Sequence, residues 1–158
     1  MRFLSHTPKN LLKGIALVRL DFNTEDSWRM EAVLPTLTFL LRHAEKVMVM
    51  SHKGRPKGKV DPKLSLRKNA LQLSRLIKRR VVFISHFRFD EIKKTIDAAP
   101  RGSVFLLENL RFQKGEQFDD SRVPKTLIAK RIVSLGDFYV YDAFAVSHRA
   151  HASVDAIT

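Results

Sequence analysis

The chain has 158 residues, of which 44% are hydrophobic, and it contains no cysteine. This length supports one globular domain with a sizeable core and is too short for two ordinary domains. No stretch is apolar over the length that crosses a bilayer, and residues 1–9 lack the apolar core of a secretory signal, so we expect a cytoplasmic protein without membrane contact. The absence of cysteine excludes disulfides and thiolate metal sites.

The charge balance points to anionic partners. Twenty-nine Lys and Arg against sixteen Asp and Glu give a formal net charge of +13, which raises the encounter rate with anions. Charge alone leaves nucleic acid, an acidic membrane surface and a small phosphorylated metabolite open. Many of these residues, including Arg75, Lys78, Arg79 and Arg80, are typical of a solvated helix face.

The first half of the chain alternates predicted strands with predicted helices. A strand at 15–22 is followed by a helix at 29–44, in which Pro35 must lie in the first turns or bend the axis. A strand at 47–51 and a long basic loop precede the next helix, for which Ser65 is the expected N-cap.

The second half continues the alternation. A strand at 81–84 is followed by a helix opened by Asp90, and a strand at 103–107 by a helix that Gly136 should end; a last strand is expected at 138–141. The strand runs are continuously apolar, which is typical of parallel strands covered on both faces. The sequence therefore predicts an α/β fold, a three-layer Rossmann-like domain with a parallel sheet flanked by helices.

Polar residues follow four of these strands. Because ligands bind outside the carboxyl ends of the strands in open α/β sheets, we expect the polar clusters to share one rim and to form one site. The clusters are Asp21-Phe22-Asn23, Ser51-His52-Lys53-Gly54-Arg55, Glu108-Asn109-Leu110-Arg111 and Ser147-His148-Arg149-Ala150-His151.

The arginines of this rim suit an anion, because a guanidinium is a planar fork of donors that matches carboxylate and phosphate oxygens. Arg29, Arg55, Arg111 and Arg149 all follow predicted strand ends. For any one of them, a solvent-facing charge or a local ion pair is an equal alternative. For the four together that alternative is much weaker.

The histidines of the rim leave several roles open. His52, His148 and His151 could donate to the same anion or act as acid or base near neutral pH. A metal site at His148 and His151 is a weaker alternative, since no carboxylate with a supporting role is obvious nearby.

Asp21 and Asn23 flank Phe22, so in an extended chain both polar side chains face one side and the ring faces the core. That pair suits a substrate with hydroxyl groups. The chain has neither a Gly-x-x-x-x-Gly-Lys-Ser/Thr loop nor a Gly-x-Gly-x-x-Gly turn after a strand, so the two common nucleotide phosphate cradles are absent.

Taken together, these segments resemble the amino-terminal, substrate-binding half of phosphoglycerate kinases. The resemblance covers nearly the whole chain in the family's order. The matching segments are 18–23 (VRLDFN), 29 with 32–36 (AVLPT), 50–56 (MSHKGRP), 107–112 (LENLRF) with 114–116 (KGE), and 142–144 (DAF) with 148–153 (HRAHAS).

The resemblance implies reversible phosphoryl transfer between 1,3-bisphosphoglycerate and ADP, giving 3-phosphoglycerate and ATP, in glycolysis and gluconeogenesis. In the family, the positions of Asp21 and Asn23 hold the glycerate, and that of Arg29, the expected catalytic residue, reaches the transferring phosphoryl group. The positions that hold the fixed phosphate correspond to His52, Arg55, Arg111 and Arg149. The expected substrate-binding set also includes Phe22, Ser51, Gly54, Leu110 and His148.

The resemblance also implies a second half of the enzyme. The family binds ATP or ADP with Mg²⁺ in a carboxy-terminal domain, and we expect residues 1–158 to be the 3-phosphoglycerate-binding domain without that partner domain. We therefore expect a monomer that binds 3-phosphoglycerate or 1,3-bisphosphoglycerate, holds no cofactor or metal itself, and is inactive alone. The alternative is a stand-alone anion-binding or nucleic-acid-binding module that kept the fold and lost the reaction. Against nucleic acid, no exposed aromatic set is interleaved with lysines for base stacking.

Overall fold

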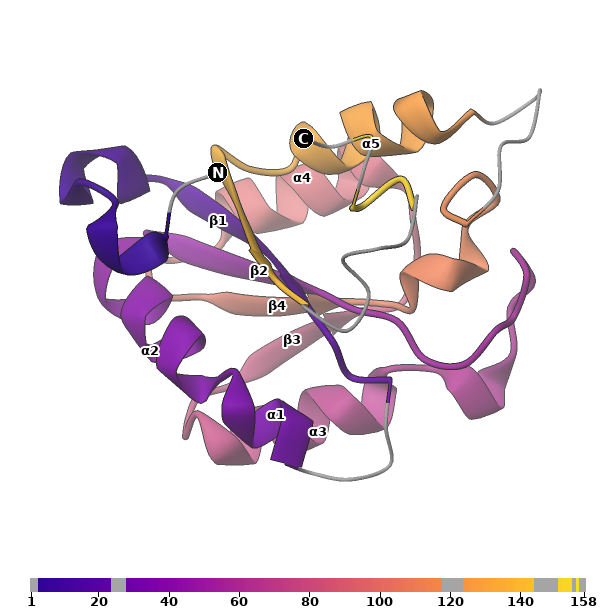
Figure 1. The fold of residues 1–158 in the computed structure, drawn as a ribbon, viewed down its shortest axis with the longest axis horizontal. Helices are drawn as coiled ribbons and strands as arrows, with labels where there is room; N and C mark the ends of the chain where they lie inside the picture. The colour runs from indigo at the N-terminus through magenta and orange to yellow at the C-terminus, as the bar shows by residue number, and fades with distance from the viewer. Residues whose placement is uncertain (1–2, 24–27, 118–123, 144–150, 155, 157–158) are drawn as a thin grey trace.

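A five-stranded parallel sheet forms the centre of the molecule (Figure 1), as the continuous apolar runs predicted. The computed structural model describes residues 3–23, 28–117, 124–143, 151–154 and 156. The strand order is β3-β4-β2-β1-β5. The strands are β1 (Ile15–Leu20), β2 (Lys46–Met50), β3 (Val81–Ile84), β4 (Val104–Leu107) and β5 (Phe138–Asp142).

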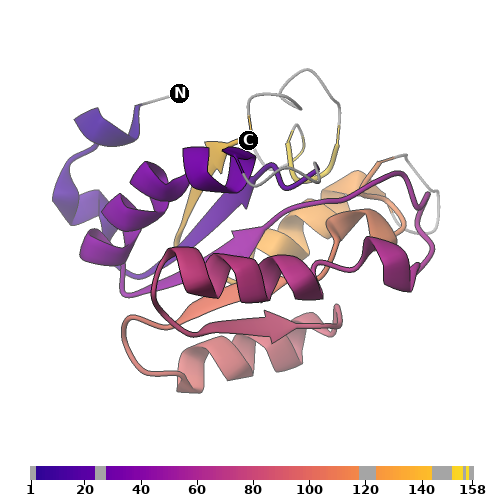
Figure 2. The ribbon, with the colours of Figure 1, turned by 90° about the horizontal axis from the view of Figure 1, so that it is seen from below.

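Helices cover both faces of the sheet. One apolar core lies between the sheet and α1 to α3, and a second lies between the sheet and α4 and α5 (Figure 1). Figure 2 shows the molecule from below, with α1 to α3 toward the viewer. The helices are α1 (Trp28–Ala32), α2 (Leu34–His43), α3 (Arg67–Leu76), α4 (Phe89–Ala98) and α5 (Lys125–Val133), with short 3-10 helices η1 (Leu4–His6), η2 (Lys9–Leu12), η3 (Pro62–Leu64) and η4 (Leu110–Phe112).

The predicted helix at 29–44 is two helices. The helix is interrupted at Val33, and Pro35 lies in the first turn of α2, where its missing N–H has no intrahelical partner to lose.

Among the described residues, every helix is too short or too polar to span a bilayer.

The start of α3 differs from the prediction that Ser65 is its N-cap. The helix begins at Arg67 with Leu66 as N-cap, and the amide of Leu66 donates to the Glu108 Oε1, 2.8 Å away. The Ser65 hydroxyl donates to Glu108 Oε2 at 2.7 Å and only distantly accepts from the amide of Arg67, at 3.3 Å. A buried carboxylate from the end of β4 thus caps a helix that follows β2, a long-range contact that local sequence cannot indicate.

The prediction that Gly136 ends the last helix is wrong. Helix α5 ends at Val133 and its C-cap is Ser134. At Gly136 a Cβ would lie 2.7 Å from Leu17 Cγ and 2.8 Å from the Ile15 carbonyl oxygen. Glycine is required there because the backbone passes close to β1.

The connections change face at the carboxyl edge of the sheet. After β2 the chain crosses to α3 on one face, whereas after β4 it crosses to α5 on the opposite face. The neighbours β2 and β4 therefore mark a point where the chain changes face, and ligands of open α/β sheets bind at such points. The polar clusters at 51–55 and 108–111 lie there.

Candidate functional site

The ends of β1 and β2 are joined by a buried serine. Ser51 donates its hydroxyl to the Leu20 carbonyl oxygen at 2.9 Å and accepts from the Phe22 amide at 2.9 Å. The ring of Phe22 packs in the core, 1% exposed. Ser51 therefore fixes the point where the chain leaves β1 and begins the site.

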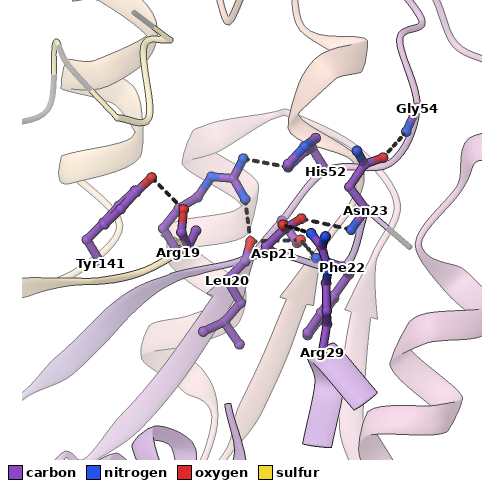
Figure 3. A network of polar contacts seen from close by, with 11 residues as sticks. Arg19, Leu20, Asp21, Phe22, Asn23, Arg29, His52, Gly54 and Tyr141 are labelled. Atoms are coloured by element: carbon purple, nitrogen blue, oxygen red, sulfur yellow. Dashed lines mark hydrogen bonds and ion pairs between the residues drawn. The ribbon is translucent and has the colours of Figure 1, made fainter. Parts of the chain in front are cut away.

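Asn23 links the segment after β1 to the basic loop after β2 (Figure 3). Its backbone N–H donates to Asp21 Oδ1 at 2.9 Å, and its side-chain Oδ1 accepts from the Gly54 backbone N–H at 2.7 Å. Gly54 has a φ of +60°, and a Cβ there would lie 2.7 Å from a methyl carbon of Leu64. Glycine is thus needed both for the left-handed backbone and for space.

The predicted catalytic arginine contacts the predicted glycerate-binding carboxylate. Arg29 Nη1 forms an ion pair with Asp21 Oδ2 (Figure 3). The Asp21 side chain is 9% exposed and that of Arg29 is 31% exposed, so the pair is open to solvent on the arginine side. The Arg29 guanidinium also lies over the Trp28 ring, 5.2 Å from its centroid. These contacts hold Arg29 at the rim.

The basic loop at 53–64 is held from β4. Asn109, which is fully buried, donates through Nδ2 to the carbonyl oxygens of Lys53 at 2.7 Å and Leu64 at 3.0 Å. One amide group therefore holds the two ends of the loop together.

Arg111 holds the same loop near its glycines. Its Nη1 donates to the Gly54 carbonyl oxygen at 2.6 Å, and its carbonyl oxygen accepts from the Gly58 amide at 3.0 Å. The Arg111 side chain is 1% exposed. A guanidinium is a fork of donors that matches phosphate and carboxylate oxygens, so Arg111 remains a candidate anion ligand at this rim.

The other predicted site residues differ in burial, and two of them are not described. Arg55 is exposed on the loop, and Leu110 is buried in the core beside α4 and α5. Phe22 and Leu110 thus offer a ligand only backbone groups. His148 and Arg149 lie outside the described residues. His151 is described and is 6% exposed.

Sequence reasoning missed Arg19, a fully buried arginine in β1. Its Nε donates to Ser153 Oγ at 3.1 Å and its Nη1 to the Leu20 carbonyl oxygen at 2.5 Å. Its Nη2 lies 2.9 Å from His52 Nδ1 (Figure 3). The signal in the sequence was a lone charge inside an apolar run, since a buried charge requires partners.

Glu116 supplies the opposite charge next to Arg19. It is fully buried, accepts from the Ser153 hydroxyl at 2.5 Å and from the Ser153 amide at 3.1 Å, and its carbonyl oxygen accepts from the Ala152 amide at 2.8 Å. The Tyr139 hydroxyl donates to the Ser153 carbonyl oxygen at 2.5 Å. Residues from β1, β5, the segment after η4 and the carboxy-terminal segment thus form one buried polar network.

Burial shifts two groups of this network. Removal from water raises the pKa of the Glu116 carboxyl, and the positive charge of Arg19 partly offsets that rise. Burial likewise raises the pKa of Tyr139 above its usual value, again with Arg19 acting in the opposite direction. Both groups are therefore less acidic than in water.

Within the described ranges, no three His, Asp or Glu side chains lie so that they could hold a metal ion. A hollow of about 240 Å³ lies between α2 and the end of α3. None of the predicted site residues lines it. The candidate site is therefore the rim at the ends of β1, β2 and β4, where the predicted residues contact one another, and not this hollow.

The fold and the candidate site define a class: an α/β domain with polar and basic residues gathered at strand ends where the chain changes face. The model of the family described as phosphoglycerate kinase matches residues 10–158. The phosphoglycerate kinase of Geobacter metallireducens is 47% identical over 157 residues, covering 93% of this chain and 38% of that protein. The enzyme of Wolbachia pipientis is 43% identical over 149 residues, covering 90% and 36%.

A solved structure agrees. That of phosphoglycerate kinase from Coxiella burnetii matches with a TM-score of 0.79 and 32% identity, covering 98% of this chain and 38% of that one. The chain belongs to the phosphoglycerate kinase family, as its motifs indicated. It spans less than two fifths of the length of each of these three relatives.

Proposed function

We propose that this chain is the 3-phosphoglycerate-binding domain of a phosphoglycerate kinase, a phosphotransferase that moves a phosphoryl group between 1,3-bisphosphoglycerate and ADP. The observation that carries the proposal is the joining of three strand-end segments: Asn23 bonds Gly54, and Gly54 bonds Arg111. These are three of the segments in which the chain resembles the family. These two hydrogen bonds bring separate motifs together at one rim of the sheet.

Each described group has a role that its chemistry allows. Asp21 and Asn23 face the glycerate hydroxyl and carboxyl, His52, Arg55 and Arg111 hold the fixed phosphate, and Arg149 is proposed to join them. Phosphoryl transfer needs little covalent help from a protein, so positioning and charge stabilisation carry the reaction.

Arg29 is the proposed catalytic residue. In this structure its guanidinium lies on Asp21, so it must move away from that carboxylate to reach a transferring phosphoryl group. The Arg29 Nε is buried and has no hydrogen-bond partner among the described residues. It is therefore a further N–H donor that Arg29 could offer to a phosphoryl oxygen after it leaves Asp21. A guanidinium there would neutralise charge that develops on the phosphoryl oxygens.

The nucleotide and Mg²⁺ do not fit this chain: no three His, Asp or Glu side chains of the described residues are grouped to hold a metal ion, and the sequence has neither common nucleotide phosphate cradle. We therefore assign ATP or ADP with Mg²⁺ to the part of the relatives that the match does not cover, and derive no step through them. The 158-residue chain alone is accordingly expected to bind 3-phosphoglycerate without turnover in a coupled ATP assay. A soluble, monomeric, cytoplasmic glycolytic protein is the corresponding cellular proposal.

Calorimetric titration with 3-phosphoglycerate tests the proposal. Arg55→Ala should weaken binding about tenfold or more, because a guanidinium on a phosphate is a charge-assisted donor. Arg75→Ala is the matched control, since Arg75 is also exposed but lies at the end of α3 near the opposite edge of the sheet. An equal loss in both variants would indicate that net charge and not a site is responsible.

The nucleic-acid module makes a different prediction for the same protein. It requires affinity for an oligonucleotide that falls steeply as salt rises, together with no saturable 3-phosphoglycerate binding. That pair of results would favour the module over the kinase domain.

A further inference from the structure

The two ring nitrogens of His52 decide between the roles that a histidine can have at this site. A neutral ring carries its proton on one nitrogen and accepts at the other, whereas a protonated ring donates from both. His52 is fully buried directly after β2, so its neighbours fix which form is present.

Arg19 faces Nδ1 of that ring. The distance from Arg19 Nη2 to His52 Nδ1 is 2.9 Å. A guanidinium carries five N–H donors, no acceptor and a permanent charge. Nδ1 must therefore hold the lone pair, and the donor inventory places the proton on Nε2. A proton on Nδ1 would set two donors face to face beside a positive charge.

The guanidinium cannot readily turn away from the ring. Its Nε is bonded to the Ser153 hydroxyl and its Nη1 to the Leu20 carbonyl oxygen. Ser153 is in turn oriented by two hydrogen bonds to Glu116. The fork is thus held in one orientation by groups from three separate segments, and loss of its partners would leave a buried charge uncompensated.

We propose that Arg19 is a positioning residue that holds His52 as the neutral Nε2–H tautomer, so that His52 serves the anion site as a fixed hydrogen-bond donor and not as a general base. The identity of the anion rests on the proposed function. The tautomer is a property of the chain without ligand. Arg19 therefore acts on the phosphate through His52 and keeps its own charge inside the network.

The tautomer can be measured directly by two-bond proton–nitrogen correlation NMR on the chain labelled with ¹⁵N-histidine, at about pH 7. His52→Gln assigns the signal. The proposal predicts an unprotonated Nδ1 and a protonated Nε2 in the wild-type chain without ligand. A protonated Nδ1, in either the other tautomer or an imidazolium, overturns it whatever the chain binds.

Variants test whether Arg19 acts through His52. Arg19→Met combined with Glu116→Gln removes both buried charges together, and should mix the His52 tautomers and weaken 3-phosphoglycerate binding about tenfold. Adding His52→Ala to this pair should weaken binding no further than His52→Ala alone. If the loss of affinity from the Arg19→Met/Glu116→Gln pair multiplied with the loss from His52→Ala, Arg19 would not act through His52.

Arg88→Met with Glu91→Gln is the matched control, an exposed pair of the same two residue types, and should leave the tautomer and binding unchanged. If the buried variant does not fold, the wild-type tautomer still decides the assignment. Absence of 3-phosphoglycerate binding with the expected tautomer overturns the proposed function and leaves the assignment standing.

Discussion

Asp21 and Arg29 form an ion pair that joins the end of β1 to α1, and each is a proposed ligand of the substrate. The pair is half-buried, with side-chain exposures of 9% and 31%. The same contact therefore holds the proposed catalytic arginine in place and covers the carboxylate that is proposed to face the glycerate. Binding must exchange this ion pair for contacts with the ligand.

A double-mutant cycle of Asp21→Ala and Arg29→Ala, read out by urea unfolding, should give a coupling of about 1 kcal/mol, at the upper end for ion pairs that solvent reaches. Lys93 and Asp97, an exposed pair within α4, are the control and should couple by about 0.3 kcal/mol. A coupling at Asp21 and Arg29 no larger than in the control would contradict the contact.

We expect replacement of Glu108 to lower the stability of the fold strongly. Glu108→Ala removes an acceptor for the Leu66 amide, the Ser65 hydroxyl and the Asn109 amide at once. We expect a loss of about 2 to 4 kcal/mol in the free energy of unfolding, since bonds to a charged acceptor are strong and buried amides would be left unpaired. Glu91→Ala, exposed in the first turn of α4, should change stability by about 0.5 kcal/mol or less. Comparable losses would refute the capping role.

Asn109→Ala should loosen the basic loop at 53–64. Two backbone carbonyls lose their donor, so the loop ends are no longer tied and the position of Gly54 is less fixed. We expect faster tryptic cleavage at the exposed Lys57 and Lys59 and weaker 3-phosphoglycerate binding, by about tenfold. Asn10→Ala, at an exposed position, is the control. Unchanged cleavage in folded Asn109→Ala would show that other contacts hold the loop.

Glu116 and Glu91 should change the pH dependence of stability in opposite directions. Burial raises the pKa of Glu116 in the folded state, so its contribution to stability is present below the ordinary value of 4.5 and is lost as pH rises through the folded value. The hydrogen bond from Arg88 lowers the pKa of Glu91, so its contribution is present above 4.5 and is lost as pH falls through the folded value.

Urea unfolding from about pH 4 to about pH 8 measures both effects. The stability of wild type relative to Glu116→Gln should fall with rising pH, and that relative to Glu91→Gln should rise. Slopes of the same sign would contradict the opposite shifts.

The sequence predicted the fold because each strand is a short, continuously apolar run, a local property. β3 has the predicted bounds, β1, β4 and β5 differ by one or two residues at one end, and β2 differs by one residue at each end. Gly136 and Ser65 were misjudged because their roles depend on β1 and on Glu108, which are distant in sequence.

The rim clusters were predicted because parallel strands end at one edge. The network of Arg19, Glu116 and Ser153 was not, because it joins residues 134 positions apart, as the Arg19–Ser153 bond shows. A charged residue inside a strand indicates that partners exist but does not say which they are. The partners of His52 followed only from the folded chain.

The most direct test of the central claim is amide NMR of the 158-residue chain during titration with 3-phosphoglycerate. The proposed site predicts saturable shifts at Asn23, Gly54 and Arg111, because their backbone and side-chain groups form the junction of the three strand-end segments. Shifts confined to the hollow lined by residues from 34–42 and 76–79, or none in a folded chain, would contradict it.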